Sequence, residues 1–141
     1  MLLGVCYCDW KCLNERHLDI SICQNSELSK ANIIDIPNHK IIKRYIENTI
    51  TNAIVIAGLE PFLQFQEIYD FVQELRNYTQ DDVVIYTGYY KNEIKEYVEK
   101  LKQYKNIIIK FGRFIPNSNK KYDDVLGIWL VSDNQYAIKI S

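Results

Sequence analysis

The chain has 141 residues, of which 48% are hydrophobic and 25% are charged, and its formal net charge is -1. This length suits one domain over residues 1–141, and the near-neutral charge argues against a nucleic-acid partner or an anionic membrane surface. No apolar run approaches the roughly 20 residues that a membrane-spanning helix needs. The start carries no basic leader, so we predict a cytoplasmic protein without a signal peptide.

The first predicted element is a short buried strand at Leu2–Tyr7, which leads directly into a cysteine-rich loop. Residues Asp9–Ile34 show no sustained hydrophobic period and are predicted to be irregular. The apolar spacing in Asn38–Thr49 predicts a helix, with a proline just ahead of it. The run Ala53–Ala57 is rich in β-branched residues, which is typical of a strand buried on both faces.

The same alternation continues to the end of the chain. Helices are predicted at Phe62–Asn77 and Lys91–Tyr104, and buried strands in "DDVVIYTGYY" and "NIIIKFGRF". Two short strands are expected in "DVLGIWLVS" and "QYAIKI", after a loop, "PNSNKKYDD". This order predicts an α/β protein with a mostly parallel sheet. The chain is too short for a closed eight-stranded barrel, which leaves a short open sheet or the partial β/α barrel that we favour.

Four segments follow the predicted parallel strands: the cysteine-rich loop, "AGLEP", "TGYY" and "KFGRF". In parallel α/β sheets, binding and catalytic sites form at the carboxyl ends of the strands. We therefore expect these four segments to meet on one rim of the sheet.

All four cysteines lie near the start, at Cys6, Cys8, Cys12 and Cys23. Clustered thiols in a cytoplasmic protein favour metal or redox chemistry over disulfides, and thiolates suit zinc or iron–sulfur clusters. A structural zinc site usually needs four ligands, so Cys6 or His17 would have to supply the fourth. Within the predicted strand, Cys6 is better interpreted as a small buried hydrophobe. His17 is interpreted as a surface residue.

Three basic residues close to these thiols are Lys11, Arg16 and Lys30. They could balance the charge of a negative cluster, or they could be ordinary solvated charges.

Six stretches, in one order along nearly the whole chain, carry a family resemblance: "CDWKC", "ICQNSEL", "AGLEPFLQ", "VVIYTGYYKNEI", "IIIKFGRFIPN" and "SDNQYAIKI". They resemble the radical S-adenosylmethionine activating proteins of anaerobic (class III) ribonucleoside-triphosphate reductase. The family signature is Cys-x3-Cys-x2-Cys, and Cys8 and Cys12 keep its first spacing. The insert "LNERHLDISI" separates Cys12 from Cys23. We interpret the chain as a small divergent branch with a lengthened cysteine loop.

The resemblance implies a [4Fe-4S] cluster held by Cys8, Cys12 and Cys23, with one iron left open for S-adenosylmethionine. It implies reductive cleavage of S-adenosylmethionine to a radical that takes a hydrogen atom from a glycine of the partner reductase. The implied partners are that reductase and an electron donor such as flavodoxin. The cofactors supply the chemistry, while the protein binds, orients and excludes water.

The resemblance also assigns positions around S-adenosylmethionine. "AGLEP" maps onto a Gly-Gly-Glu-Pro stretch in which Leu59 replaces the second glycine, Gly58 allows close approach and Glu60 accepts from the methionine ammonium. The adenosyl end would meet Ile22, Thr87 and Gly88. The cofactor-binding set that the resemblance implies is Ile22, Asn25, Gly58, Leu59, Glu60, Thr87 and Gly88.

Three further matches carry less chemistry. Lys110 and Arg113 could meet the carboxylate of S-adenosylmethionine or the partner, but we interpret both as surface charges. The stretch "SDNQ" at 132–135 matches the family tail and has no assigned role.

Two other functions remain open at this stage. A radical enzyme acting on a small molecule would need an enclosed polar pocket. A non-catalytic zinc or iron–sulfur module would use Cys6 as a fourth thiolate and leave no open coordination position.

Overall fold

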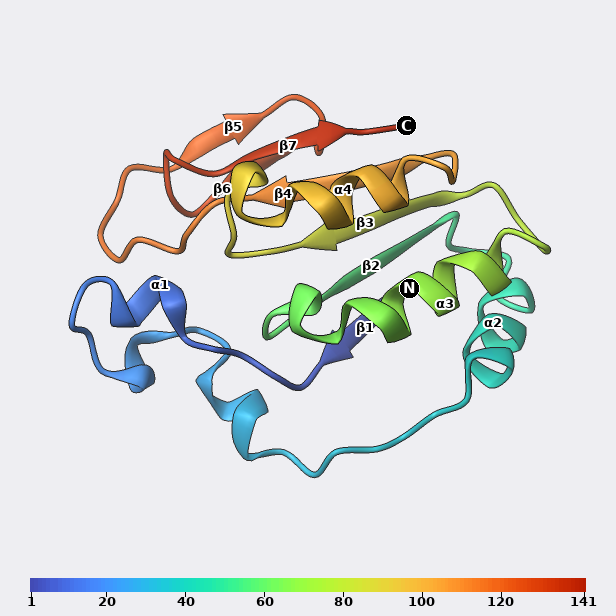
Figure 1. Ribbon diagram of the computed structural model, residues 1–141, viewed down its shortest axis with the longest axis horizontal. Helices are drawn as coiled ribbons and strands as arrows, with labels where there is room; N and C mark the ends of the chain where they lie inside the picture. The colour runs from blue at the N-terminus through green and yellow to red at the C-terminus, as the bar shows by residue number, and fades with distance from the viewer.

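The computed structural model describes all residues from 1 to 141, and its centre is a five-stranded sheet in the order β1-β2-β3-β4-β7 (Figure 1). The strands are β1 (Leu2–Val5), β2 (Ala53–Gly58), β3 (Asp82–Tyr86), β4 (Ile107–Phe111) and β7 (Tyr136–Lys139). Strands β1 to β4 are parallel to one another, and β7 runs antiparallel to β4. The prediction of an α/β fold with a mostly parallel sheet is confirmed, whereas the partial barrel stays a prediction.

The strands form where β-branched residues follow one another. Every residue of β4 is buried, and β3 has a buried centre of Val83, Val84 and Ile85. Continuous apolar strands of this kind belong in a parallel sheet that is covered on both faces. The register pairs Ile85 with Ile109, so two fully buried isoleucines lie side by side in the middle of the sheet.

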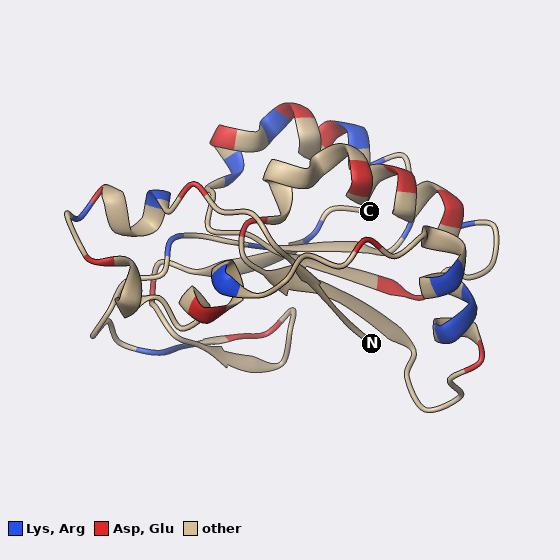
Figure 2. Cartoon of the chain, turned by 90° about the horizontal axis from the view of Figure 1, so that it is seen from below, with Lys and Arg blue, Asp and Glu red and all other residues tan.

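Three helices cover one face of the sheet, as Figure 2 shows from the side. They are α2 (Asn38–Ile46), α3 (Phe65–Leu75) and α4 (Lys95–Leu101). The last two are preceded by the 3-10 turns η3 (Pro61–Gln64) and η4 (Lys91–Ile94), so the helices predicted at 62–77 and 91–104 both begin with a tighter turn. Their apolar stripes pack on the sheet and form a core cluster of 18 buried residues. None of the helices is long and apolar enough to cross a bilayer.

A small hairpin of β5 (Lys121–Asp123) and β6 (Ile128–Leu130) covers part of the other face. The prediction that "PNSNKKYDD" is only a loop is therefore wrong, because its end forms β5. The buried carboxylate of Asp123 accepts from the backbone N–H of Leu126 at 3.0 Å and of Ala137 at 2.8 Å. This one side chain closes the hairpin turn and fixes it to β7, a long-range role that local sequence patterns do not show.

The cysteine-rich loop lies at the end of the sheet toward which β1 to β4 run (Figure 1). It contains the four-residue helix α1 (Lys11–Asn14) and the 3-10 turns η1 (Ile20–Ile22) and η2 (Ser26–Lys30). The expected irregular segment is thus a series of short turns. Its position brings the loop onto the carboxyl ends of the parallel strands.

Candidate metal centre

The ends of β2 and β3 are locked together by Glu60, whose side chain is 4% exposed. Its carboxylate accepts from the Thr87 hydroxyl at 2.7 Å and from the N–H of Gly88 at 2.9 Å and of Phe62 at 3.1 Å. Burial raises the pKa of Glu60, and these hydrogen bonds act in the opposite direction. The segments "AGLEP" and "TGYY" therefore meet on one rim, as predicted.

Cys8, Cys12 and Cys23 lie in the loop above this rim, and all three are half-buried. Burial raises the pKa of Cys8 to about 12, and the charge of Cys12 adds to that effect. The pKa of Cys12 is also raised, first by burial and then by the charge of Cys23. Cys12 thus interacts with both other thiols. The raised pKa values keep these thiols protonated, and a metal centre would have to replace those protons to bind the thiolates.

Two of these sulfur atoms already accept a backbone hydrogen bond. The N–H of Trp10 points at Cys8 Sγ with a distance of 3.3 Å, and the N–H of Asn25 points at Cys23 Sγ with a distance of 3.4 Å. Both bonds join a cysteine to the residue two positions later. N–H groups aimed at sulfur stabilise thiolates, and they are among the interactions that tune iron–sulfur clusters.

A single metal ion and an iron–sulfur cluster require different arrangements of the donor side chains. No three His, Cys, Asp or Glu side chains converge closely enough to hold one ion. A structural zinc site needs its ligands within about 2.0–2.3 Å of one atom. In a cubane cluster each cysteine binds a different iron, so the sulfur atoms stand apart. The donor side chains therefore form no ready-made site for a single ion.

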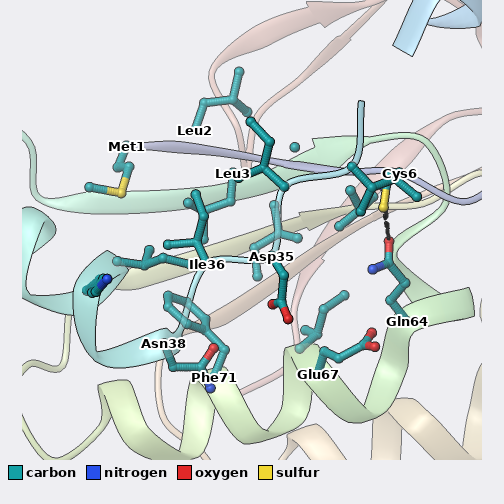
Figure 3. Close-up of a pocket in the computed structure, with 18 of the residues that line it drawn as sticks. Met1, Leu2, Leu3, Cys6, Asp35, Ile36, Asn38, Gln64, Glu67 and Phe71 are labelled. Carbon is teal, nitrogen blue, oxygen red and sulfur yellow. Dashed lines mark hydrogen bonds between the residues drawn. The ribbon is translucent and has the colours of Figure 1, made fainter. Parts of the chain in front are cut away.

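Cys6 does not join the other thiols. Its N–H and its Sγ both donate a hydrogen bond to the amide oxygen Oε1 of Gln64, at 3.0 Å and 3.7 Å. Figure 3 shows the sulfur directed at that amide. Strand β1 ends at Val5 and not at Tyr7 as predicted, so the alternation that would put Cys6 and Cys8 on one side does not extend that far. Cys6 instead lines a cavity of about 1030 Å³ beside β1 that none of the other three cysteines lines. His17 is exposed.

Lys110 and Arg113 are buried, so the interpretation of both as surface charges is wrong. Lys110, at the end of β4, is 8% exposed, and its ammonium makes one long hydrogen bond of 3.4 Å to the carbonyl of Gly112. Burial lowers the pKa of Lys110 to about 8, against the opposing charges of Glu60 and Cys12. Lys110 is therefore a buried cation with free donors, and the charges of the rim carboxylate and of the second cysteine act on it.

Arg113 is 2% exposed and connects the cysteine loop to the rim. Its guanidinium donates to both carboxylate oxygens of Glu15 at 3.0 Å and 2.9 Å, to Glu93 at 2.7 Å and to the carbonyl of Gly88 at 2.5 Å. Its charge also opposes the rise in the pKa of Cys12 that burial causes. The sequence reasoning missed this role because Glu15 is 98 residues away along the chain.

The basic residues expected near the thiols have other partners. Lys11 pairs with Glu93 at 2.6 Å, and Lys30 pairs with Glu27 at 2.7 Å on the exposed surface. Arg16 is exposed. The buried cations whose charge reaches a candidate ligand are instead Lys110 and Arg113, which are carried by β4 and the loop after it.

Asn25 connects the third cysteine to the end of β2. Its side-chain amide donates to the carbonyl of Gly58 at 2.7 Å. Gly58 has a φ of 108°, and a Cβ there would lie 3.0 Å from the backbone N and O of Val5. Glycine is required at this position by both its conformation and the close approach of β1.

The other residues implied for S-adenosylmethionine take varied positions. Thr87 is buried, and its hydroxyl also accepts from the N–H of Tyr89 at 3.0 Å. Leu59 is buried, whereas Ile22 is among the exposed large hydrophobic side chains. Their roles in cofactor binding stay predictions.

The tail match "SDNQ" has a structural role. The Ser132 hydroxyl accepts from the N–H of Ile115 at 2.9 Å and donates to its carbonyl at 3.1 Å. Gln135 donates to the carbonyl of Gly112 at 3.4 Å. The tail therefore holds the loop that carries Arg113.

Comparison with known proteins supports the cluster. A family model described as "4Fe-4S single cluster domain" matches residues 3–138, which is nearly the whole chain. No curated protein and no solved structure gave a significant match. The chain therefore belongs to the family of 4Fe-4S single cluster domains, and a [4Fe-4S] cluster is the cofactor that this membership supports.

Proposed function

We propose that this protein is an activating enzyme that reductively cleaves S-adenosylmethionine at a [4Fe-4S] cluster and installs a glycyl radical on an anaerobic ribonucleotide reductase. The observation that carries the proposal is that Cys8, Cys12 and Cys23, all half-buried, lie in one loop at the carboxyl ends of a parallel sheet, in a chain of the 4Fe-4S single cluster family. The order of the sequence stretches that resemble activating proteins supports the finer assignment.

Cys8, Cys12 and Cys23 would hold the cluster as thiolates. Cys6 would not be a ligand, because its sulfur contacts the side-chain amide of Gln64. Three ligands leave one iron open, which is the condition for binding a second molecule at the cluster. The cluster would supply one electron to S-adenosylmethionine, whose carbon–sulfur bond then breaks to give methionine and the radical that takes a hydrogen atom from the partner's glycine.

The rim offers groups for both ends of the methionine part of S-adenosylmethionine. Lys110 has free donors beside Cys12 and could bind the carboxylate. Glu60 accepts three hydrogen bonds within the chain. A carboxylate has about four lone-pair sites, so Glu60 retains capacity for the ammonium. Burial strengthens both interactions because water competes less for the charges.

Two competing functions predict different outcomes. A small-molecule radical enzyme would need an enclosed polar pocket at the cysteines, whereas the cavity beside β1 is lined mainly by hydrophobic residues and by none of the three candidate ligands. A non-catalytic module would use Cys6 as a fourth thiolate, whereas Cys6 contacts Gln64. The contact of Cys6 with Gln64 favours the activating enzyme over the four-thiolate module.

The test is anaerobic reconstitution with iron and sulfide, followed by dithionite, S-adenosylmethionine and an assay for 5′-deoxyadenosine. We expect about four irons per chain in the wild type and in Cys6→Ala, and loss of both iron and product in Cys8→Ala, Cys12→Ala and Cys23→Ala. Bound zinc, or a cluster that never cleaves S-adenosylmethionine, would reject the enzyme. Retained product in Cys23→Ala would reject the ligand assignment.

A further inference from the structure

Both ends of helix α1, which carries Cys12, are held to the rim by ion pairs. Lys11, immediately before Cys12, pairs with Glu93 at 2.6 Å. Glu15, the C-cap residue that follows the helix, accepts two hydrogen bonds from Arg113 at 3.0 Å and 2.9 Å. The partners Glu93 and Arg113 belong to the segments after β3 and β4, so these contacts join the cysteine loop to the sheet.

Arg113 is the centre of this arrangement. It contacts Glu15 and Glu93 at the same time, and its guanidinium lies 5.6 Å from the ring centre of Tyr89 and 5.0 Å from that of Tyr90. We call Arg113, Glu15, Glu93 and Lys11 the Arg113 clasp. It contains two positive and two negative side chains, so its formal charges cancel. A bidentate arginine–carboxylate pair adds geometric specificity that a lysine does not provide.

Helix α1 cannot hold Cys12 in place by itself. It has four residues and no side-chain cap, and isolated helices of this length are unstable. Its one buried apolar contact is Leu13, which is 0% exposed. The orientation of Cys12 therefore depends on Leu13 and on the clasp.

We propose that Arg113 is a positioning residue for the iron–sulfur cluster: through Glu15 it fixes the helix that presents Cys12, and the clasp balances the charge beside that ligand. This inference rests on the proposed cluster. It concerns a residue that contacts neither iron nor S-adenosylmethionine in this assignment, and it acts by geometry and charge.

Because the formal charges of the clasp cancel, removing a negative or a positive member should shift the midpoint potential of the cluster in opposite directions. Glu15→Gln leaves an excess positive charge beside Cys12, which favours the reduced and more negative cluster, so the midpoint potential rises. Arg113→Gln leaves two carboxylates without their shared cation, so the midpoint potential falls. A role in folding alone gives no reason for opposite shifts.

The first experiment measures the midpoint potential, the EPR spectrum and the iron content of the reconstituted protein without S-adenosylmethionine. We expect a rise in Glu15→Gln, a fall in Arg113→Gln and no change in Glu99→Gln, which breaks an exposed ion pair of the same kind with Lys102. Shifts of the two clasp variants in one direction, or no shift in either, would overturn the proposal. If Arg113→Gln fails to fold, the unchanged potential of Glu15→Gln would still contradict it.

A second experiment tests the positioning without the cluster. Arg113→Lys keeps the charge but loses the two-pronged contact with Glu15, so the alkylation of Cys12 in the metal-free protein should become at least about threefold faster. Cys6, which lies outside the loop, should keep its rate and serves as the internal control. Equal rates of Cys12 in the variant and the wild type would overturn the proposal. A wild type that binds no cluster would reject the proposed function, while this measurement would still decide the positioning role.

Discussion

The two halves of the cysteine loop are held in very different ways. The first half, residues 8–15, has three long-range side-chain contacts with the rim. Asp9 accepts from the Tyr89 hydroxyl at 2.6 Å, and the Lys11–Glu93 and Glu15–Arg113 pairs follow at 2.6 Å and 2.9 Å. Cys8 and Cys12 are thus presented by a segment that is fastened at several points.

The second half, residues 16–30, is held mainly by its own local turns. Its backbone hydrogen bonds join neighbouring residues, such as Cys23 to Ile20 and Ser26 to Cys23. The hydrogen bond that ties it to the sheet runs from Asn25 to the carbonyl of Gly58. Cys23 is therefore carried by a segment with a single long-range polar anchor.

This difference explains how the altered spacing is tolerated. The insert "LNERHLDISI" places ten residues between Cys12 and Cys23, where the related signature has two. Loop-closure entropy grows only with the logarithm of length, so this change costs about 1.4 kcal/mol. The contacts of Asp9 and Lys11 lie before the insert, and Glu15, near the start of the insert, adds a third contact with the rim.

The largest expected effect comes from the anchor of the second half. Gly58→Ala forces a side chain into a φ of 108° and against the backbone of Val5 at 3.0 Å. We expect the free energy of unfolding to fall by about 2 kcal/mol or more, measured by denaturant unfolding of the metal-free protein. Gly4→Ala is the matched control, since nothing lies within 4 Å of a Cβ there. A Gly58→Ala protein as stable as the control would contradict the requirement for glycine at the end of β2.

The next effect isolates the single hydrogen bond. Asn25→Ala removes the donor to Gly58, a contact worth about 1 kcal/mol, so iron should be lost to a chelator about fivefold faster. Unfolding of the metal-free protein should change little, because Asn25 is exposed. The control is Asn32→Ala, an exposed asparagine in the segment that follows η2. Similar rates for both variants would show that the second half has other support.

The first half should respond to acid. Burial acts to raise the pKa of Glu93, but hydrogen bonds from Arg113 and Lys11 outweigh it and lower that pKa to about 2 from the ordinary 4.5. A carboxylate whose pKa is lowered by folding stabilises the fold at pH values above its pKa in the unfolded chain. This stability is lost as the pH falls from about 4.5 toward 2. The metal-free wild type should lose more stability over this range than Glu93→Gln. Parallel pH profiles of the two proteins would contradict the ion-pair account.

The smallest effect is expected where the contacts are redundant. Tyr89→Phe removes the hydroxyl that donates to Asp9, but both ion pairs of the first half remain. The rate of iron loss should therefore change less than in Asn25→Ala, by under about twofold if the lost bond is worth less than ~0.5 kcal/mol. A larger effect in Tyr89→Phe than in Asn25→Ala would reverse the comparison.

The sequence predicted the parts of the molecule that depend on local pattern. The β-branched runs located β2, β3 and β4, and the rule that sites form at strand ends brought Glu60, Thr87 and Gly88 onto one rim. The buried roles of Lys110 and Arg113 were not predicted, because their partners are distant in sequence and a lysine or arginine near a loop usually faces solvent. The strand β5 was missed for the same reason, since the buried carboxylate of Asp123 fixes it from the side of β7.

Hydrogen–deuterium exchange of peptides covering 8–15 and 16–30, before and after cluster loading, tests the central claim most directly. Segments held only by local turns open at low free energy. In the metal-free protein, residues 16–30 should exchange faster than 8–15, and loading should protect 16–30 far more because Cys23 then gains a fixed partner. Equal protection of both halves before loading, or no gain in 16–30 after it, would contradict a cluster that closes on Cys23.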